Sequence, residues 1–268
     1  MSRATRFALA ILAGWTLALL LAPTGQEAVT RIDLARLFEV PGPTAWMGTD
    51  DLGRSLGWRV VAGARVSLLV AVVVVAVTAV IGIAVGVAAG WLGGAVDLVL
   101  ARIVDVFLAF PGILLAIALA GVLGPGIGNV VIALSVVGWV GFARLARAQT
   151  LAMREREHVA VARALGTPVP VILRRHILPL IAGPLVVEGT FALAAVIIAE
   201  AGLSFLGLGV QPPAPSWGSL IRDGTRYMLF APHLVVMPGL ALFSVVVAIN
   251  VLGERLRDRL QAARRPGN

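Results

Sequence analysis

The stretch from Val106 to Ala143 contains no charged residue. A helix that crosses the apolar part of a bilayer needs about 20 such residues, so this stretch is long enough for nearly two crossings. The turn-forming sequence GPGIGN, at Gly124 to Asn129, divides it. We therefore expect two membrane helices here, one on each side of the turn.

The rest of the chain agrees with a membrane protein. Only 13% of the 268 residues are charged and 59% are hydrophobic, against roughly 25% and 45–50% in soluble domains. The apolar runs predict an all-α integral membrane protein with six transmembrane helices. The expected spans are Phe7 to Pro23, Val66 to about Gly90, the two halves of Val106 to Ala143, Leu180 to about Glu200, and about Pro232 to Gly253.

The first run has a second interpretation. Arg3 and Arg6 precede it, and a basic start followed by an apolar run is also typical of a secretory signal peptide. The run is rather long for a leader, and no clear small-x-small cleavage site follows before Pro23. We therefore expect a membrane helix.

The distribution of arginines orients the spans. All 22 basic residues are Arg; 15 fall on the side that carries both termini and seven on the other. Because cytoplasmic loops are enriched in basic residues, we expect both termini in the cytoplasm. The expected organisation is a cytoplasmic start with the first span (1–23), an extracytoplasmic segment (24–65), a membrane core of five helices (66–253) with a cytoplasmic loop at 149–179 and an extracytoplasmic loop at 201–231, and a cytoplasmic tail (254–268).

The cytoplasmic loop contains the segment MREREHVAVARALGTPVPVILRRHILP, from Met153 to Pro179. It predicts a helix that stops at Gly166, because glycine readily takes the backbone conformation that ends a helix. Thr167 is a good N-cap and Pro168 a favoured first residue for a second helix, which Pro179 is expected to close. The segment is therefore predicted to form a helix, a bend and another helix.

Both helices of this segment have a one-sided apolar pattern. The positions are Val159, Ala162 and Leu165 in the first helix, and Val169, Ile172, Leu173, His176 and Ile177 in the second. An element of this kind can lie on the lipid surface, or it can dock into a groove of a soluble partner protein. The residues alone leave both alternatives open.

Small residues line one face of the span that starts at Val66. Gly82, Gly86 and Gly90 follow at intervals of four, with Thr78 one step earlier. Such a face lets another membrane helix approach closely, because helices in lipid associate through van der Waals packing. We expect it to pack within this chain or against a second membrane subunit, rather than to face lipid as a bend-tolerant surface.

Two carboxylates fall within or near the fifth span. Glu188 interrupts it, and a charge at membrane depth is costly unless it faces a bundle interior or a watery path. Glu188 is therefore a candidate for a water-lined pathway, with a satisfied hydrogen bond between helices as the alternative. Glu200, near the extracytoplasmic end, is a second pathway candidate.

Several kinds of chemistry find no support. The chain has no Cys, and its three His lack ligand spacing, so no metal site is expected. The net charge of +8 comes from arginines that flank spans, so nucleic acid is not an expected partner. A phosphate-binding P-loop needs a Lys, and the chain has none. An intramembrane serine protease would need a nucleophile and a His both at membrane depth, and a metalloprotease would need His-Glu-x-x-His, which is absent, so an intramembrane enzyme is not expected.

The pattern Ala-x-Ala-Arg-Ala-Leu-Gly at Ala160 to Gly166, followed by His-Ile-Leu-Pro at His176 to Pro179, resembles the EAA loop of binding-protein-dependent ABC transporter permeases. More narrowly, it is similar to the C-type permease subunit of the dipeptide, oligopeptide and nickel importers. The Glu-Ala-Ala of that family reads Ala160-Val161-Ala162 here, which removes one polar contact to the ATPase.

Further blocks resemble the same family in the same order. They are GTDDLGRS (Gly48 to Ser55, with Ser55 in place of the family Asp), GARVSLLV (Gly63 to Val70), AAGWLGGAVD (Ala88 to Asp97), RIVDVFLAFPGILLAI (Arg102 to Ile117), EAGLSFLGLGVQPPAPSWG (Glu200 to Gly218) and LGERLRD (Leu252 to Asp258). Taken singly, the first block is equally a polar turn, and the Pro-rich stretch in the fifth is equally a stiff linker.

This resemblance implies a type I ABC importer permease fold in the bacterial inner membrane. It implies a second, usually different permease subunit, two ATPase subunits that bind ATP and Mg, and an extracytoplasmic substrate-binding protein; this chain itself would bind no cofactor and catalyse nothing. Dipeptides or oligopeptides are the expected substrates, with nickel or another small solute as the alternative. The residues expected to couple to the ATPase are Ala160, Val161, Ala162, Arg163, Ala164, Leu165, Gly166 and Thr167.

The resemblance also implies a surface that receives the binding protein. We expect the loop 201–231 and the stretch from Gly48 to Arg65 to form it. Within the loop, the candidates to face the binding protein are Trp217, Arg222 and Arg226.

Overall fold

The computed structural model describes residues 3–22 and 27–264, and its regular elements are helices. Strands are absent from these residues, where an isolated bridge joins Thr49 and Ser55. The predicted all-α class is thus confirmed, whereas the chain start, Pro23 and residues 265–268 lie outside the described part. The helices are α1 (Arg3–Leu21), α2 (Glu27–Thr30), η1 (Leu34–Arg36), α3 (Leu56–Leu92), α4 (Gly94–Leu108), α5 (Gly112–Leu123), α6 (Ile127–Arg154), α7 (Glu157–Ala164), α8 (Val169–Ile172), the π-helical turn η2 (Leu173–Ile177), α9 (Leu178–Phe205), α10 (Trp217–Thr225) and α11 (His233–Arg264).

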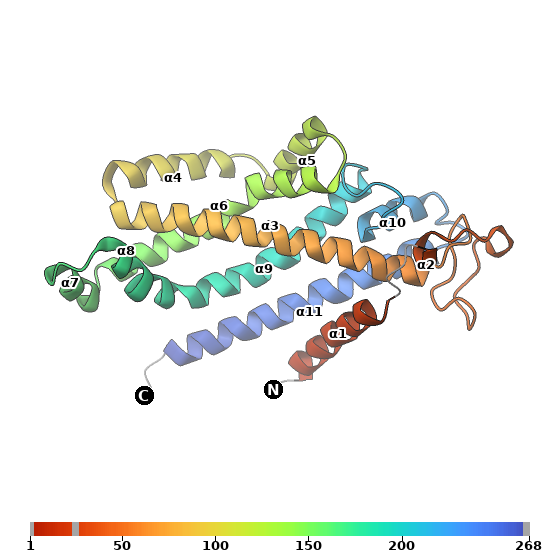
Figure 1. Ribbon diagram of the computed structural model, residues 1–268, viewed down its shortest axis with the longest axis horizontal. Helices are drawn as coiled ribbons and strands as arrows, with labels where there is room; N and C mark the ends of the chain where they lie inside the picture. The colour runs from red at the N-terminus through yellow and green to blue at the C-terminus, as the bar shows by residue number, and fades with distance from the viewer. Residues whose placement is uncertain (1–2, 23–26, 265–268) are drawn as a thin grey trace.

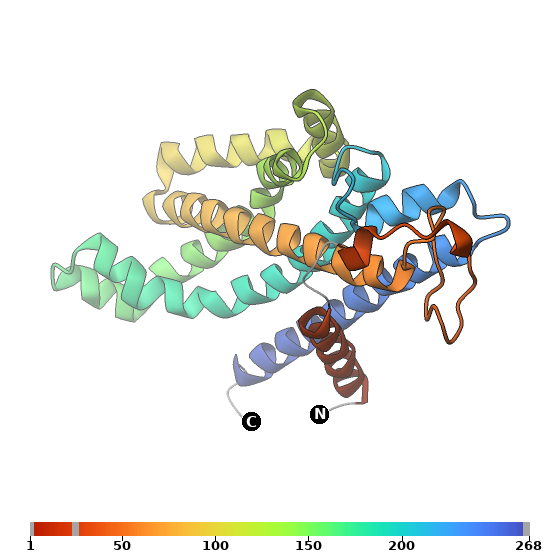
Figure 2. The same cartoon turned by 45° about the vertical axis from the view of Figure 1, so that its right-hand side comes forward.

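The long helices α3, α6, α9 and α11 extend along the molecule, as Figure 1 shows. Helices α7 and α8 lie at one end, called here the α7 end. Helix α10, helix α2 and the loop that precedes α3 lie at the other, the α10 end. Helix α1 runs toward the α10 end and α11 runs away from it, so both termini point away from that end (Figures 1 and 2).

In the part of the chain that the structure describes, five helices are long and apolar enough to cross a membrane. They are Arg3–Leu21, Leu56–Leu92, Ile127–Arg154, Val169–Phe205 and His233–Ala262. Helices α4 and α5 meet the same test only as a pair, which brings the total to six if the pair is one span. The predicted bundle of six spans agrees with this count.

The third predicted span is not one straight helix. It was expected to run from Val106 to the GPGIGN turn, but α4 already ends at Leu108 and α5 begins at Gly112 after a bend of 81°. Pro111 explains the break, because proline disfavours the helical conformation in the residue before it. The GPGIGN turn is confirmed, with positive φ angles at Gly124 (86°) and Gly126 (146°).

Two spans are longer than expected. Helix α3 has 37 residues, and α8, η2 and α9 together form a helix of 37 residues from Val169 to Phe205. At 1.5 Å per residue each is about 55 Å long, whereas the hydrocarbon layer is about 30 Å thick. Each of these helices therefore extends beyond the hydrocarbon layer.

The glycine face of α3 packs against α6 of the same chain. This is one of the two arrangements that the sequence predicts, the other being contact with a second membrane subunit. A Cβ atom on Gly82 would lie 2.6 Å from Phe142 Cβ, and a Cβ on Gly86 would lie 2.8 Å from Ala146 Cβ. A Cβ on Gly90 would lie 2.8 Å from the carbonyl oxygen of Arg147. No side chain fits at these three positions, so α3 and α6 form a closely packed pair.

Helix α1 belongs to the bundle. The indole of Trp15 donates a hydrogen bond to Ser244 Oγ on α11 (3.0 Å) and packs edge-on against Trp217, with ring centroids 5.5 Å apart. Arg65 of α3 donates to the carbonyl oxygen of Leu19 (2.7 Å). These contacts join α1 to α3 and α11.

Candidate functional site

The predicted coupling segment, residues 149–179 and called here the coupling segment, turns at Gly166 as the sequence predicts. Gly166 has φ 73°, its N–H donates to the Arg163 carbonyl (2.9 Å), and the Thr167 N–H donates to the Ala162 carbonyl (3.0 Å). These two bonds are the Schellman arrangement that ends a helix with a left-handed glycine. The second helix begins one residue later than predicted, with Pro168 rather than Thr167 at the N-cap.

Helix α7 has a buried and an exposed side. Val159 and Ala162 are buried, and they share a core with Val87, Phe142 and Ile172. Leu165, which the apolar pattern grouped with them, is 79% exposed and lies at the turn. The other predicted coupling residues that lie exposed are Ala160, Val161, Arg163, Ala164 and Gly166, with Thr167 half-buried. The exposed side therefore offers apolar atoms at the α7 end.

Pro179 does not end the second helix, contrary to the prediction. The chain passes through the π-helical turn η2, where the Leu178 N–H donates to the carbonyl of Leu173, and continues as α9. Proline has no N–H and crowds the preceding turn, and a wider π turn accommodates both effects. The coupling segment is thus continuous with a membrane helix.

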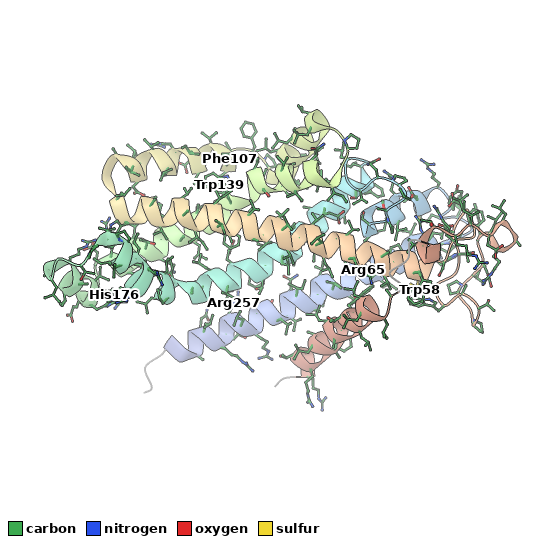
Figure 3. All side chains as sticks on the ribbon, in the orientation of Figure 1. Trp58, Arg65, Phe107, Trp139, His176 and Arg257 are labelled. Atoms are coloured by element: carbon green, nitrogen blue, oxygen red, sulfur yellow. The ribbon has the colours of Figure 1, made fainter. Side chains whose placement is uncertain are left out.

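The structure brings together two of the three histidines. The His158 and His176 rings lie 6.1 Å apart between centroids, on α7 and η2; Figure 3 labels His176 at the α7 end. The Nε2 atom of His233 lies 3.3 Å from the carbonyl oxygen of Thr49 at the α10 end. Within residues 3–22 and 27–264, no three His, Asp or Glu side chains form a metal-binding group.

At the α10 end, the GTDDLGRS loop is ordered by Asp50. Its carboxylate accepts hydrogen bonds from the backbone N–H groups of Leu52 (3.0 Å) and Arg54 (2.9 Å) and from Arg54 Nε (2.7 Å). Arg59, in the first turn of α3, lies 3.4 Å from the same carboxylate and is buried. The loop is therefore a folded polar turn fixed to the start of α3.

The structure contradicts one predicted receiving residue. Trp217 is fully buried, and its indole donates to the Val60 carbonyl (3.1 Å), so it cannot face a binding protein in this structure. Ser216 and Ser219 form a capping box that starts α10 and turns Trp217 inward. Arg222 is half-buried and pairs with Asp223 at 3.1 Å, whereas Arg226 is exposed.

An apolar tip follows α10 and was not recognised from the sequence. Met228, Leu229 and Phe230 are 53%, 98% and 64% exposed. Tyr227 supports the tip by stacking edge-on against Phe38, with centroids 4.9 Å apart, and its hydroxyl donates to Asp51 (3.3 Å). The Asp51 carboxylate raises the pKa of Tyr227, which keeps this donor protonated.

Glu200 lies in the interior of the chain. It is 1% exposed, and its two carboxylate oxygens accept hydrogen bonds from Ser67 and Ser204, each at 2.7 Å. Ser204 Oγ also accepts from the Val210 N–H (3.2 Å), which connects α9 to the following loop. This geometry describes a link between α3, α9 and the loop, and it gives no support to a pathway role for Glu200.

Glu188 is half-buried and borders a cavity of about 310 Å³ between α6, α9 and α11. Arg257 and Gln261 of α11 line the same cavity; Figure 3 labels Arg257. The Glu188 carboxylate lies against Gly141 of α6 and makes no hydrogen bond with a described residue. The alternative of a hydrogen bond between helices is therefore not supported.

The neighbours of Glu188 show its depth. On the side of Glu188 nearer the α7 end, Gly183 of α9 lies against Leu260 of α11. On the side nearer the α10 end, Thr190 of α9 lies against Gly253 of α11. Glu188 is therefore level with the charged stretch of α11 that follows Gly253.

A pattern typical of hydrolases also occurs in the chain. Gly53-Arg54-Ser55-Leu56-Gly57 matches the Gly-x-Ser-x-Gly pattern of a nucleophile elbow. An elbow joins a strand to a helix, whereas here Ser55 is the N-cap of α3 and takes part in the isolated bridge mentioned above. Ser55 forms no hydrogen bond to a histidine in the described part of the chain, so this turn is not a catalytic elbow.

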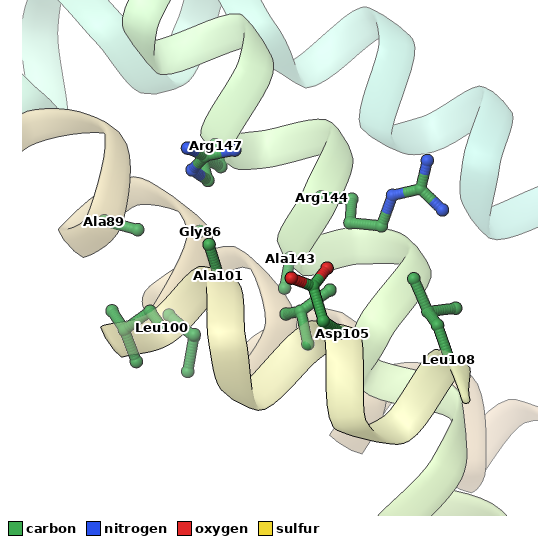
Figure 4. A pocket seen from close by; sticks show the side chains of 11 residues that line it. Gly86, Ala89, Leu100, Ala101, Asp105, Leu108, Ala143, Arg144 and Arg147 are labelled. Atoms are coloured by element: carbon green, nitrogen blue, oxygen red, sulfur yellow. The ribbon is translucent and has the colours of Figure 1, made fainter. Parts of the chain in front are cut away.

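A second cavity, of about 270 Å³, lies between α3, α4 and α6 toward the α7 end. Asp105 of α4 and Arg144 and Arg147 of α6 line it (Figure 4). Arg147 is already engaged, because it pairs with Asp97 near the start of α4 (Nη2 to Oδ2 2.7 Å). The cavity thus separates part of α4 from the α3 and α6 pair.

A bundle of apolar helices with an amphipathic turn at one end is the architecture of an integral membrane protein. The chain belongs to the family of binding-protein-dependent transport system inner membrane components, whose sequence model matches residues 82–266. It is therefore a permease subunit of a binding-protein-dependent ABC importer. A subunit of this kind carries transport rather than catalysis.

Relatives and solved structures agree with this family. The chain is 44% identical over 234 residues to the glutathione transport system permease protein GsiD of Escherichia coli O6:K15:H31, covering 87% of this chain and 77% of the relative. The Pectobacterium atrosepticum protein of the same name is 40% identical, with 87% and 78% covered. An inward-facing structure of the MetNI methionine ABC transporter is similar with a TM-score of 0.62 at 21% identity, covering 78% of this chain and 97% of that chain, which shows a shared fold.

Proposed function

We propose that this permease imports short peptides. The two relatives above are glutathione permeases by name, and glutathione is itself a small peptide. Nickel or another small solute is the alternative within the family, and no specific observation on the described residues favours it. The substrate class therefore rests on the relatives, and it needs a direct test.

The partners are those of an ATP-driven importer. We infer that the α7 end is cytoplasmic, because most arginines and both termini lie on that side. The observation that carries the coupling role is the exposed apolar surface of α7, with Leu165 79% exposed beside the Gly166 turn. We infer two ATPase subunits, which hold ATP and Mg, a second and different permease chain, and an extracytoplasmic binding protein at the α10 end.

In this mechanism ATP closes the two ATPase subunits, and the coupling segments around Gly166 move with them. The pathway between the two permeases then opens outward to accept substrate, and hydrolysis returns it to the inward-open state. This chain contributes packed helices with two arrangements, which the ATPase and the binding protein bias in opposite directions.

Purification in mild detergent from the native gene cluster tests the assembly. We expect mass spectrometry of the purified material to identify a second permease and ATPase subunits. Binding protein loaded with glutathione or a dipeptide should then stimulate ATP hydrolysis, whereas binding protein exposed to nickel salts should not. A chain that purifies alone contradicts the importer assembly. Stimulation by nickel instead of peptide contradicts the proposed substrate class.

We propose that the tip Met228–Phe230 is part of the surface that receives the binding protein, with Arg226 beside it. It is the outermost part of the α10 end in Figure 2, and a leucine that is 98% exposed on a supported turn suits burial against a partner. We expect Leu229→Asp to weaken stimulation by the binding protein by about tenfold, since a buried Leu contributes about 1.5–3 kcal/mol. Leu229→Met is the matched control; an aspartate variant that responds like wild type contradicts the assignment.

The pathway role of Glu188 is tested by labelling. Because Glu188 borders a cavity that Arg257 and Gln261 also line, we expect a Glu188→Cys variant to react with a membrane-impermeant thiol reagent in one nucleotide state and to be protected in the other. This chain has no native Cys, so labelling of this chain reports on this position alone. A cysteine at position 188 that stays unlabelled in every nucleotide state contradicts the pathway role.

A further inference from the structure

The elbow between α3 and α4 is held by three arginines. Helix α3 ends at Leu92 and α4 begins at Gly94, with positive φ angles at Gly93 (65°) and Gly94 (52°). Two glycines in this conformation make a sharp turn that few other residues could form. The elbow thus joins the closely packed helix α3 to a helix that leaves it at once.

The first two arginines come from α6. Arg147 pairs with Asp97 near the start of α4, and the Arg154 Nη1 donates to the Gly90 carbonyl at the end of α3 (3.0 Å). Because Gly90 also packs directly against α6, these contacts hold the elbow to α6. They connect membrane helices to each other and do not involve α7.

The third arginine comes from α7 itself. The guanidinium carbon of Arg163 lies 4.4 Å from the ring centroid of Trp91, which is within the range of a favourable cation–π contact. Trp91 is partly buried against the core that also contains Val159 and Ala162 of α7. Arg163 therefore reaches directly from the coupling segment to the last turn of α3.

Helix α4 is free to respond to movement of the elbow. Val104 is the one buried residue on α4, and the cavity of Figure 4 separates part of α4 from its neighbours. Beyond α4 the chain bends by 81° into α5. A helix with one buried residue, a cavity on one side and a break at its far end offers little resistance to displacement.

We propose that Arg163 and Trp91 are positioning residues that transmit movement of the coupling segment to the α3–α4 elbow, and through it to α4. This inference rests on the proposed function, because it requires an ATPase to move α7. It assigns to Arg163 a role inside the permease, in place of a contact on the ATPase. Trp91, outside the coupling segment, becomes part of the coupling machinery.

The test uses the complete transporter with both permeases, the ATPase subunits and the binding protein. We expect Arg163→Gln and Trp91→Leu each to lower the ratio of ATP hydrolysis with and without binding protein by about fivefold. This is the factor that corresponds to the loss of one cation–π contact. The double variant should lose no more than either single variant, because the two side chains act as one contact. Arg163→Lys and Trp91→Phe, which keep a cation and a ring, should restore most of the ratio.

The control is Arg6→Gln, which removes an exposed arginine of α1, outside the coupling segment, and should leave the ratio unchanged. The proposal is overturned if the double variant loses as much of the ratio as the two single variants together. It is also overturned if the Trp91→Leu variant keeps the wild-type ratio. If the ATPase subunits fail to assemble with the wild-type chain, the proposed function fails and this inference fails with it. If the subunits assemble but the Trp91 and Arg163 variants keep the wild-type ratio, this inference fails and the proposed function stands.

Discussion

Replacing Gly166 with proline is expected to reduce ATP-driven transport by at least about tenfold. The φ angle at Gly166 is 73°, whereas proline is fixed near −65° and has no N–H. The substitution therefore removes the bond from the Gly166 N–H to the Arg163 carbonyl and redirects the turn that presents Leu165. Uptake of labelled substrate into proteoliposomes that contain the complete transporter measures the effect.

The matched control at this position is Gly166→Asn. A Cβ at Gly166 meets nothing within 4 Å, so backbone conformation alone decides the outcome. Asparagine takes the left-handed conformation more readily than other side chains do, so this variant should keep most of the transport. Gly166→Val, which fits the space but not the φ angle, should behave like the proline variant. Equal transport in the valine and asparagine variants would show that the turn is not required.

Replacing Gly86 with leucine is expected to prevent normal folding of the chain. A Cβ at this position would lie 2.8 Å from Ala146 Cβ and 2.9 Å from the Arg147 nitrogen, so α3 and α6 must separate. Overpacking of this kind costs about 1–3 kcal/mol or more. We expect a lower yield of monodisperse protein in detergent and a lower thermal unfolding midpoint.

Gly121→Ala is the control for that experiment. Gly121 also lies within a helix, but a Cβ there meets nothing within 4 Å. Its unfolding midpoint should therefore match that of the wild type. A Gly86→Leu variant with a wild-type midpoint would contradict the packing of α3 on α6.

The features that depend on local sequence could be predicted. Charge-free runs located the spans, because the bilayer excludes charge over a fixed length. The Gly82, Gly86 and Gly90 spacing indicated a close helix contact, and Gly166 indicated a helix stop. The bend at Pro111 was missed, because an uninterrupted apolar run hides a break that a single proline causes within it.

The features that depend on tertiary packing could not be predicted. Trp217 was expected at the surface because the family resemblance assigns its loop to the side that receives the binding protein, but it follows the capping box of α10 and its indole bonds to the Val60 carbonyl. The depth of Glu188 depends on how far α9 extends beyond the apolar layer, which no local pattern reveals. The contact of Arg163 with Trp91 joins residues that are distant in the chain, and their spacing gives no signal for it.

Under the proposed function, the continuous helix from Val169 to Phe205 would act as a lever. It begins in the coupling segment and ends beside the loop that leads to α10, so no hinge loop separates the two ends. A rigid rod of about 55 Å that tilts by roughly 5° displaces its far end by about 5 Å. A π turn lies just before Pro179, and such turns are less regular than an α-helix. Under the proposed function, the stiffness of this turn would set how much of an ATPase movement reaches the α10 end.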